Sequence, residues 1–164
     1  MFKKINILIL SMFFIGYSKY APGTVASFLT SLIYVFFYNF QINFILLILI
    51  IVLIFIFSVY SIDFFKNSFD NIDAKEIVID EFVGQSIPLL TIYSIVPKEN
   101  IEIFLPYVLI SFISFRFFDI LKIYPANIVD KKMKNGFGVM LDDVIAGFYS
   151  AVVILFIFVF GYYE

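Results

Sequence analysis

The sequence predicts an all-α fold, a polytopic membrane helical bundle of about five spans plus a short N-terminal helix that is interfacial or re-entrant. Of the 164 residues, 63% are hydrophobic and only 15% are charged, whereas soluble globular chains carry about 25% charged residues. The mean hydropathy is +1.04, and several apolar runs approach the roughly 20 residues that one membrane crossing requires. No polar linker is long enough to divide the chain, so we expect residues 1–164 to form a single domain.

The apolar run over residues 5–15 follows Lys3 and Lys4. It resembles a signal-peptide core, but no small-residue cleavage site follows it, so we expect it to be retained and to lie on the membrane or dip into it. Gly and Pro predict a loop over residues 16–24. Further apolar runs predict five helices, over residues 25–40, 44–62, 80–96, 101–120 and 144–163.

The connections between these helices are polar. A polar stretch over residues 63–75 joins the second helix to the third, and we expect neighbouring helices to accommodate Pro88 inside the third. Residues 122–134 are expected to form a solvated basic loop that attracts anionic lipid headgroups. Residues 135–143 are expected to form a Gly-containing loop that ends in two adjacent acids, Asp142 and Asp143.

The basic residues predict one orientation. With residues 63–80 in the cytoplasm, ten of the 11 Lys and Arg residues are cytoplasmic and only Lys98 is outside, as the positive-inside rule requires. In this arrangement four polar motifs share the cytoplasmic face: residues 16–24, Asp80–Glu81, residues 116–122 and Asp142–Asp143. A simpler reading of the Asp pair is that it caps the start of a helix, where negative charge suits the dipole.

Composition limits the available chemistry. The chain has no Cys and no His, which excludes thiol nucleophiles, disulfides, His bases and zinc sites with His or Cys ligands. No basic patch with interleaved aromatic residues indicates a nucleic-acid partner. Any reaction must therefore use carboxylates, hydroxyls, Lys, Arg and hard cations.

Five acids are expected at one level of the bundle: Asp80, Glu81, Asp119, Asp142 and Asp143. Like charges this close do not all stay ionised unless a cation joins them, and oxygen ligands favour Mg²⁺ or Mn²⁺. Five acids exceed one Mg²⁺ site, so either two ions bind or some acids act as a base. The small residues Gly84, Ala146 and Gly147 would let the acidic helices approach closely.

Arg116, Asp119 and Lys122 recur every three residues along one helical stripe. The single arginine is suited to clamp a phosphate, although Arg116 and Asp119 would also neutralise each other as an internal pair. Backbone amides at Thr24, after Ala-Pro-Gly, are able to hold an anion at a helix start, and an ordinary N-cap explains them equally well. Together these residues favour a metal-dependent phosphohydrolase or phosphotransferase that acts on a lipid.

The motifs resemble the phosphatidylglycerophosphatase A family, whose members remove the terminal phosphate of phosphatidylglycerophosphate. The matching pieces, in the order and spacing of the family, are Ala21–Thr24 with Ser27, Ile79–Gln85, Phe115–Ile120 with Lys122, and Gly136–Met140 with Asp142, Asp143, Ala146 and Gly147. The chain departs from the family's usual residues at Lys19, Ala26 and Ile123. These departures remove no acid and no arginine, and they leave the loop geometry near Lys19 and Ile123 open.

The resemblance implies Mg²⁺-dependent hydrolysis of a phosphate monoester on a membrane lipid, at a cytoplasm-facing site in a bacterial inner membrane. We expect Asp80, Asp142 and Asp143 to bind Mg²⁺, Glu81 or Asp119 to act as base, and Arg116 and Lys122 to bind the phosphate. Thr24 is expected to contact the substrate. Water is the preferred nucleophile, and an aspartyl-phosphate intermediate and attack by Thr24 remain alternatives.

Two rival classes stay open from the sequence. A CDP-alcohol phosphotransferase also uses a membrane-embedded carboxylate cluster, but its characteristic spacing of acids along two helices is absent. A cation transporter would place ionisable groups near the middle of several spans, and residues 44–62 and 144–163 have none there. The sequence leaves the oligomeric state open.

Overall fold

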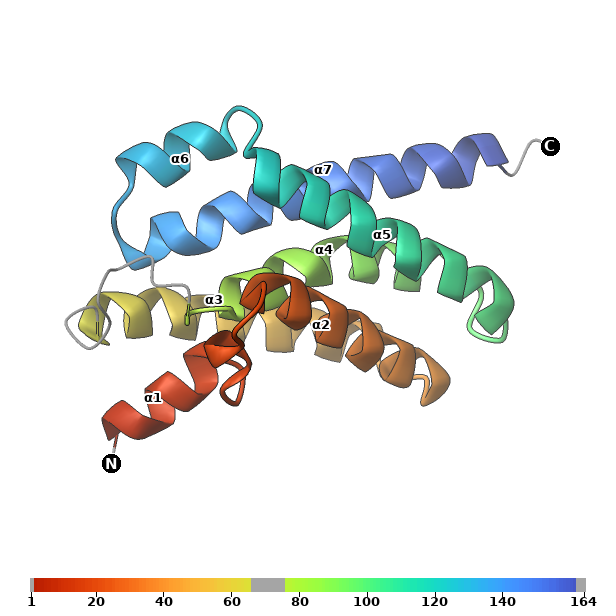
Figure 1. The fold of residues 1–164 in the computed structure, drawn as a ribbon. Helices are drawn as coiled ribbons and strands as arrows, with labels where there is room; N and C mark the ends of the chain where they lie inside the picture. Colours follow the sequence, from red (N-terminus) through yellow and green to blue (C-terminus); the bar gives the residue numbers. More distant parts are fainter. Residues whose placement is uncertain (1, 66–75, 162–164) are drawn as a thin grey trace.

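The computed structural model describes residues 2–65 and 76–161, and within them the chain is helical with no strand. The predicted all-α class is therefore confirmed (Figure 1). In chain order the elements are α1 (Phe2–Leu10), the 3₁₀ turn η1 (Ile15–Tyr17), α2 (Pro22–Asn39), α3 (Phe44–Phe65), α4 (Ile79–Ile95), α5 (Ile101–Leu121), α6 (Ala126–Lys132) and α7 (Gly136–Gly161). Most of the predicted connection over residues 63–75 lies outside the described residues.

Three of the described helices are long and apolar enough to cross a membrane: α5, α7 and the stretch Phe44–Phe64 of α3. The helices α2 and α4 are shorter, with 18 and 17 residues, and they carry buried polar side chains. The structure thus supports a membrane protein, while the expected count of five spans is not confirmed.

Two expected loops are wrong, and the loop expected over residues 16–24 is shorter than predicted, because η1 ends at Tyr17 and α2 begins at Pro22. The basic stretch over residues 122–134 contains the helix α6, and α7 begins at Gly136 rather than at residue 144. The early start of α7 has a local cause, because the amides of its first turn find side-chain acceptors. The Gly136 N–H donates to Asp63 Oδ1 at 2.7 Å, and the Gly138 N–H donates to Asn135 Oδ1 at 2.8 Å, as at a capped helix start. Asp142 and Asp143 therefore lie inside a helix.

The helix α4 packs against α2, α3, α5 and α7 and so occupies the centre of the bundle. Its closest approach is to α7, where a Cβ on Gly147 would overlap the Gly84 carbonyl oxygen, and a Cβ on Gly84 would lie 2.7 Å from the Asp143 carbonyl oxygen. Small residues permit this contact between backbones. The predicted role of Gly84 and Gly147 in bringing two helices together is confirmed.

An aromatic cluster holds the other end of the bundle, where α2 ends and α5 begins. The rings of Tyr38 and Phe104 stack with centroids 3.8 Å apart, and Tyr93 meets Tyr38 edge-on at 5.9 Å. The Tyr38 hydroxyl donates to the Pro97 carbonyl, and the Tyr93 hydroxyl donates to the Ile42 carbonyl at 2.5 Å. Aromatic rings with bonded hydroxyls stabilise this end.

Candidate metal and phosphate site

The start of α2 meets the start of α4 and the end of α5 at Gly23. A Cβ on Gly23 would overlap Glu81 Oε1 and would lie 3.3 Å from Arg116 Nη1. A larger residue here would have to displace the end of the Glu81 side chain. The sequence motif Ala21–Thr24 contains Gly23, but the motif did not predict its contact with Glu81 and Arg116.

Three carboxylates gather at this junction. Asp80 and Glu81 of α4 and Asp143 of α7 each offer an oxygen within 4.8 Å of the others. Asp143 is only 4% exposed, and the Glu81 side chain is 16% exposed. Asp143 Oδ2 and Glu81 Oε2 are buried and have no hydrogen-bond partner among the described residues. Buried carboxylates without donors require a cation or a proton, so this group of acids fits a hard divalent ion.

Arg116 lies beside the three carboxylates on α5. Its Nη1 atom is 2.5 Å from Asp119 Oδ2 and 3.9 Å from Glu81 Oε1, so the internal pair with Asp119 does form. The guanidinium is nevertheless not fully used, because the buried Nε atom has no hydrogen-bond partner among the described residues. Arg116 therefore retains a donor for an anion.

Lys122 forms a second charged group directly after α5, where its backbone has a left-handed conformation with φ 45°. Its Nζ atom is 2.8 Å from Asp130 Oδ1 of α6 and also binds Asp142 of α7. Burial acts to lower the pKa of Lys122, but hydrogen bonds to Asp130 and Asp142 raise that pKa above its usual value. The hydrogen bond from Lys122 in turn lowers the pKa of Asp130.

The two adjacent acids of α7 thus face different partners. Successive residues of a helix point about 100° apart: Asp143 joins the two acids of α4, and Asp142 binds Lys122. The structure places Glu81, expected as a base, with Asp80 and Asp143, and it places Asp142, expected as a metal ligand, outside that group. The ligand and base roles themselves stay predictions.

Polar residues around the carboxylates complete the site. Gln85, one turn after Glu81, donates from Nε2 to Ser111 Oγ at 3.0 Å and so connects α4 to α5. Thr24 is the third residue of α2, next to Gly23. The first hydrogen bond that turns this helix runs from the Val25 N–H to the Ala21 carbonyl at 3.1 Å. The N–H groups of Gly23 and Thr24 come before this hydrogen bond, at the positions where a helix leaves its first amides without a partner inside the helix.

The fold and the site together define a helical membrane protein with a group of three carboxylates beside an arginine. Residues 8–158 match the family described as Phosphatidylglycerophosphatase A. The chain belongs to this family.

Individual relatives support this assignment. Phosphatidylglycerophosphatase A of Haemophilus influenzae is 44% identical over 82 residues, which cover 50% of this chain and 45% of that protein. The Escherichia coli protein of the same name is 34% identical over 85 residues, or 52% of this chain and 45% of that protein. Each match thus spans less than half of the relative.

A longer match links the chain to Bacteroides thetaiotaomicron. A protein of that organism, provisionally named phosphatidylinositol-3-phosphatase, is 34% identical over 145 residues, which cover 85% of this chain and 84% of that protein. No solved structure matches the chain.

Proposed function

We propose that this protein is a Mg²⁺-dependent lipid phosphatase that hydrolyses the terminal phosphate of phosphatidylglycerophosphate and releases phosphatidylglycerol and inorganic phosphate. The observation that carries the proposal is the set of three carboxylate oxygens within 4.8 Å of one another, beside an arginine. Membership of the Phosphatidylglycerophosphatase A family supports it.

Asp80, Glu81 and Asp143 are the residues that would hold Mg²⁺. When bound, the ion supplies Lewis-acid polarisation of a phosphoryl oxygen and offsets the charge of the acids. Arg116 binds a second phosphoryl oxygen through its unpaired Nε–H. The amides of Gly23 and Thr24, at the start of α2, point to the same region and favour an anion there.

Asp119 is the best candidate for the general base, because Glu81 belongs to the carboxylate group. It lies 2.5 Å from Arg116, next to the place assigned to the phosphate. In the proposed step Asp119 takes a proton from a water molecule while the water oxygen attacks phosphorus. The ester P–O bond breaks, and the leaving oxygen of the glycerol headgroup takes up the proton that Asp119 received, which restores the Asp119 carboxylate. Water is the preferred nucleophile in this proposal because the chain has neither Cys nor His, and an aspartyl-phosphate intermediate and attack by Thr24 are the alternatives.

Lys122 and Asp142 act next to this centre. The cation of Lys122 offsets the charges of Asp142 and Asp130, so it limits the negative charge next to the place where further negative charge develops during transfer. Asp142 is thus assigned to orienting Lys122.

The test is phosphate release by the purified protein, first with Mg²⁺ and then with a chelator. We expect release from phosphatidylglycerophosphate that stops on chelation and returns when Mg²⁺ is added back. Release that ignores the chelator would contradict the metal assignment. No release from any lipid phosphate would favour the cation-transport alternative.

A phosphoinositide is the second candidate substrate. The relative with the longest of these matches is the Bacteroides protein provisionally named phosphatidylinositol-3-phosphatase. Phosphatidylinositol 3-phosphate in the same assay, at equal surface concentration, separates the two substrates. A higher kcat/KM for the phosphoinositide would move the assignment to that lipid and would leave the residue roles unchanged.

The proposed orientation places the carboxylates at the cytoplasmic face of a bacterial inner membrane. The absence of native Cys allows a direct test with single-cysteine variants. Lys131→Cys lies at the carboxylate end and Lys98→Cys at the opposite end of the helices. A membrane-impermeant thiol reagent on intact cells is expected to label only Lys98→Cys. Labelling of Lys131→Cys alone would reverse the orientation.

A further inference from the structure

An apolar groove runs along the lipid-facing junction of α2 and α5. It has a volume of about 190 Å³, and its walls include Phe28, Leu32 and Val35 of α2 and Leu105, Leu109 and Phe112 of α5. We call it the α2–α5 groove. Its walls are open on one side, since Leu32 is 48% exposed and Leu109 is 59% exposed.

One end of the groove lies about one helical turn from the charged site. Phe112 lies one helical turn before Arg116, and Phe28 lies one turn after Thr24, so each pair shares a helix face. The rings of Phe28 and Phe112 meet edge-on at 6.1 Å, and about one helical pitch of 5.4 Å further Gly23 lies against Arg116. Arg116 Nε, which has no hydrogen-bond partner among the described residues, therefore lies about one helical turn beyond the end of the α2–α5 groove.

This combination is complementary to a phospholipid, which carries a phosphate and an acyl chain on one molecule. We propose that one acyl chain of the substrate lies in the α2–α5 groove while its terminal phosphate is bound at Arg116. The inference rests on the proposed function. Inside a bilayer the groove has little hydrophobic advantage over lipid; its effect is to orient the headgroup toward the carboxylates.

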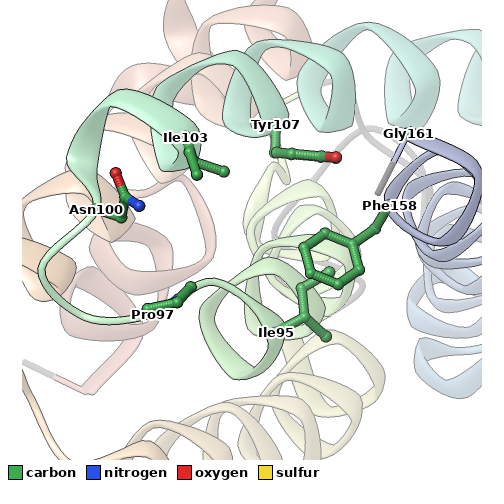
Figure 2. A pocket seen from close by; sticks show the side chains of 7 residues that line it. All are labelled: Ile95, Pro97, Asn100, Ile103, Tyr107, Phe158 and Gly161. Atoms are coloured by element: carbon green, nitrogen blue, oxygen red, sulfur yellow. The ribbon is translucent and has the colours of Figure 1, made fainter. Parts of the chain in front are cut away.

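Two of the other cavities lack this connection. The largest described cavity, about 620 Å³, lies between Ile95, Asn100, Tyr107 and Phe158 (Figure 2). Ile95 is the last residue of α4, and Asp80 lies in the first turn of the same helix, about 22 Å away at 1.5 Å per residue. This cavity is therefore remote from the carboxylates. A groove of about 360 Å³ between α5 and α7 includes Ile113 and Phe118. The cation one turn beyond Phe118 is Lys122, which Asp130 and Asp142 already bind.

The two grooves beside α5 provide a matched test. Leu109 faces the α2–α5 groove and Ile113 faces the α5–α7 groove, and both side chains are 59% exposed. The measurement is kcat/KM for diacyl phosphatidylglycerophosphate divided by kcat/KM for the same headgroup without acyl chains. Leu109→Trp is expected to lower this ratio about tenfold by displacing the chain. Ile113→Trp is expected to keep it within about twofold.

Equal ratios for the two variants would overturn the groove assignment. A wild-type kcat/KM that is the same for short-chain and long-chain substrates would also overturn it, without any variant. If Leu109→Trp does not accumulate, Leu32→Trp on the opposite wall makes the same measurement. Failure of the wild-type protein to release phosphate from either substrate would instead contradict the proposed function.

Discussion

The two ends of the helical bundle treat their polar groups differently. At the end where α2 stops and α5 starts, the hydroxyls of Tyr38 and Tyr93 are hydrogen-bonded to backbone carbonyls among packed rings. At the other end, Glu81 Oε2, Asp143 Oδ2 and Arg116 Nε are buried without a hydrogen-bond partner among the described residues. The tyrosine hydroxyls of the aromatic end are thus hydrogen-bonded, whereas the carboxylate end has donors and acceptors without a partner among the described residues.

The two ends are therefore expected to contribute differently to the stability of the protein and to ligand binding. A buried polar group without a partner costs roughly 1–3 kcal/mol, and more when it is charged, so the carboxylate end weakens the folded protein. Such groups persist where a ligand completes them. From this contrast we expect activity to depend on the carboxylate end and stability on the aromatic end. Each variant below tests that expectation.

The largest effect is expected from Asp143→Asn. The amide keeps the size of the side chain but removes the charge that holds the cation, so phosphate release should fall on the order of 10³-fold with the protein still folded. Glu102→Gln changes an exposed acid at the opposite end of α5 and should keep release within about twofold. Comparable losses in the two variants would remove the distinction between the ends.

Gly147→Ala is expected to have the next largest effect, on stability and activity together. Its Cβ would overlap the Gly84 carbonyl, and overpacking of this kind costs about 1–3 kcal/mol. Far-UV circular dichroism in detergent suits the measurement, since the chain has no Trp. Gly161→Ala in the same helix is the control, because its Cβ would meet nothing within 4 Å. An unchanged midpoint for Gly147→Ala would contradict the close approach.

Tyr38→Phe tests the aromatic end. The variant removes the hydroxyl that donates to Pro97 and accepts from the Asn100 N–H at 3.2 Å, and it should lower the free energy of unfolding by about 1 kcal/mol. Because Tyr38 is remote from the carboxylates, kcat/KM of the folded fraction should not change. A loss of kcat/KM without a loss of stability would show that the two ends are coupled.

The smallest effect is expected from Asp130→Asn, which removes one partner of Lys122. The lowered pKa of Asp130 means that its ionised form adds stability above the ordinary Asp pKa of about 3.9, and this contribution is lost as pH falls through the lower folded pKa. The variant should therefore lose less than about 1 kcal/mol at neutral pH and nothing in strong acid. The control is Glu99→Gln, which changes an exposed acid at the aromatic end and should keep the free energy of unfolding at neutral pH within about 0.5 kcal/mol.

Sequence patterns predicted most of the helices because apolar runs and turn residues mark them directly. The expected helix over residues 101–120 is observed as Ile101–Leu121, and that over residues 80–96 as Ile79–Ile95. The start of α7 was missed because Gly136 and Gly138 favour a loop by composition. Their role depends on contacts with Val59 and Met133, which no local pattern contains.

The sequence predicted that these motifs lie together at one site, but it did not show which of the charged residues contact one another. Adjacent acids such as Asp142 and Asp143 look equivalent in sequence, and the rotation of α7 decides between them. A signal was nevertheless present, because Asp143 and Gly147 are four residues apart and share the face that must approach α4. The pairing of Lys122 with Asp130 was not visible, since it requires α6.

Pro88 has a consequence for how accurately the acids are held. A proline has no N–H, so the Gly84 carbonyl loses the hydrogen bond that the fourth residue onward normally donates. Gly147 lies against that same carbonyl oxygen, where its Cα–H is a weak substitute donor. Sliding α7 along α4 would remove this contact, and a backbone acceptor without a partner is costly inside a membrane protein. The proline thereby fixes the register of the two helices and, with it, the spacing of Asp80 and Glu81 from Asp143.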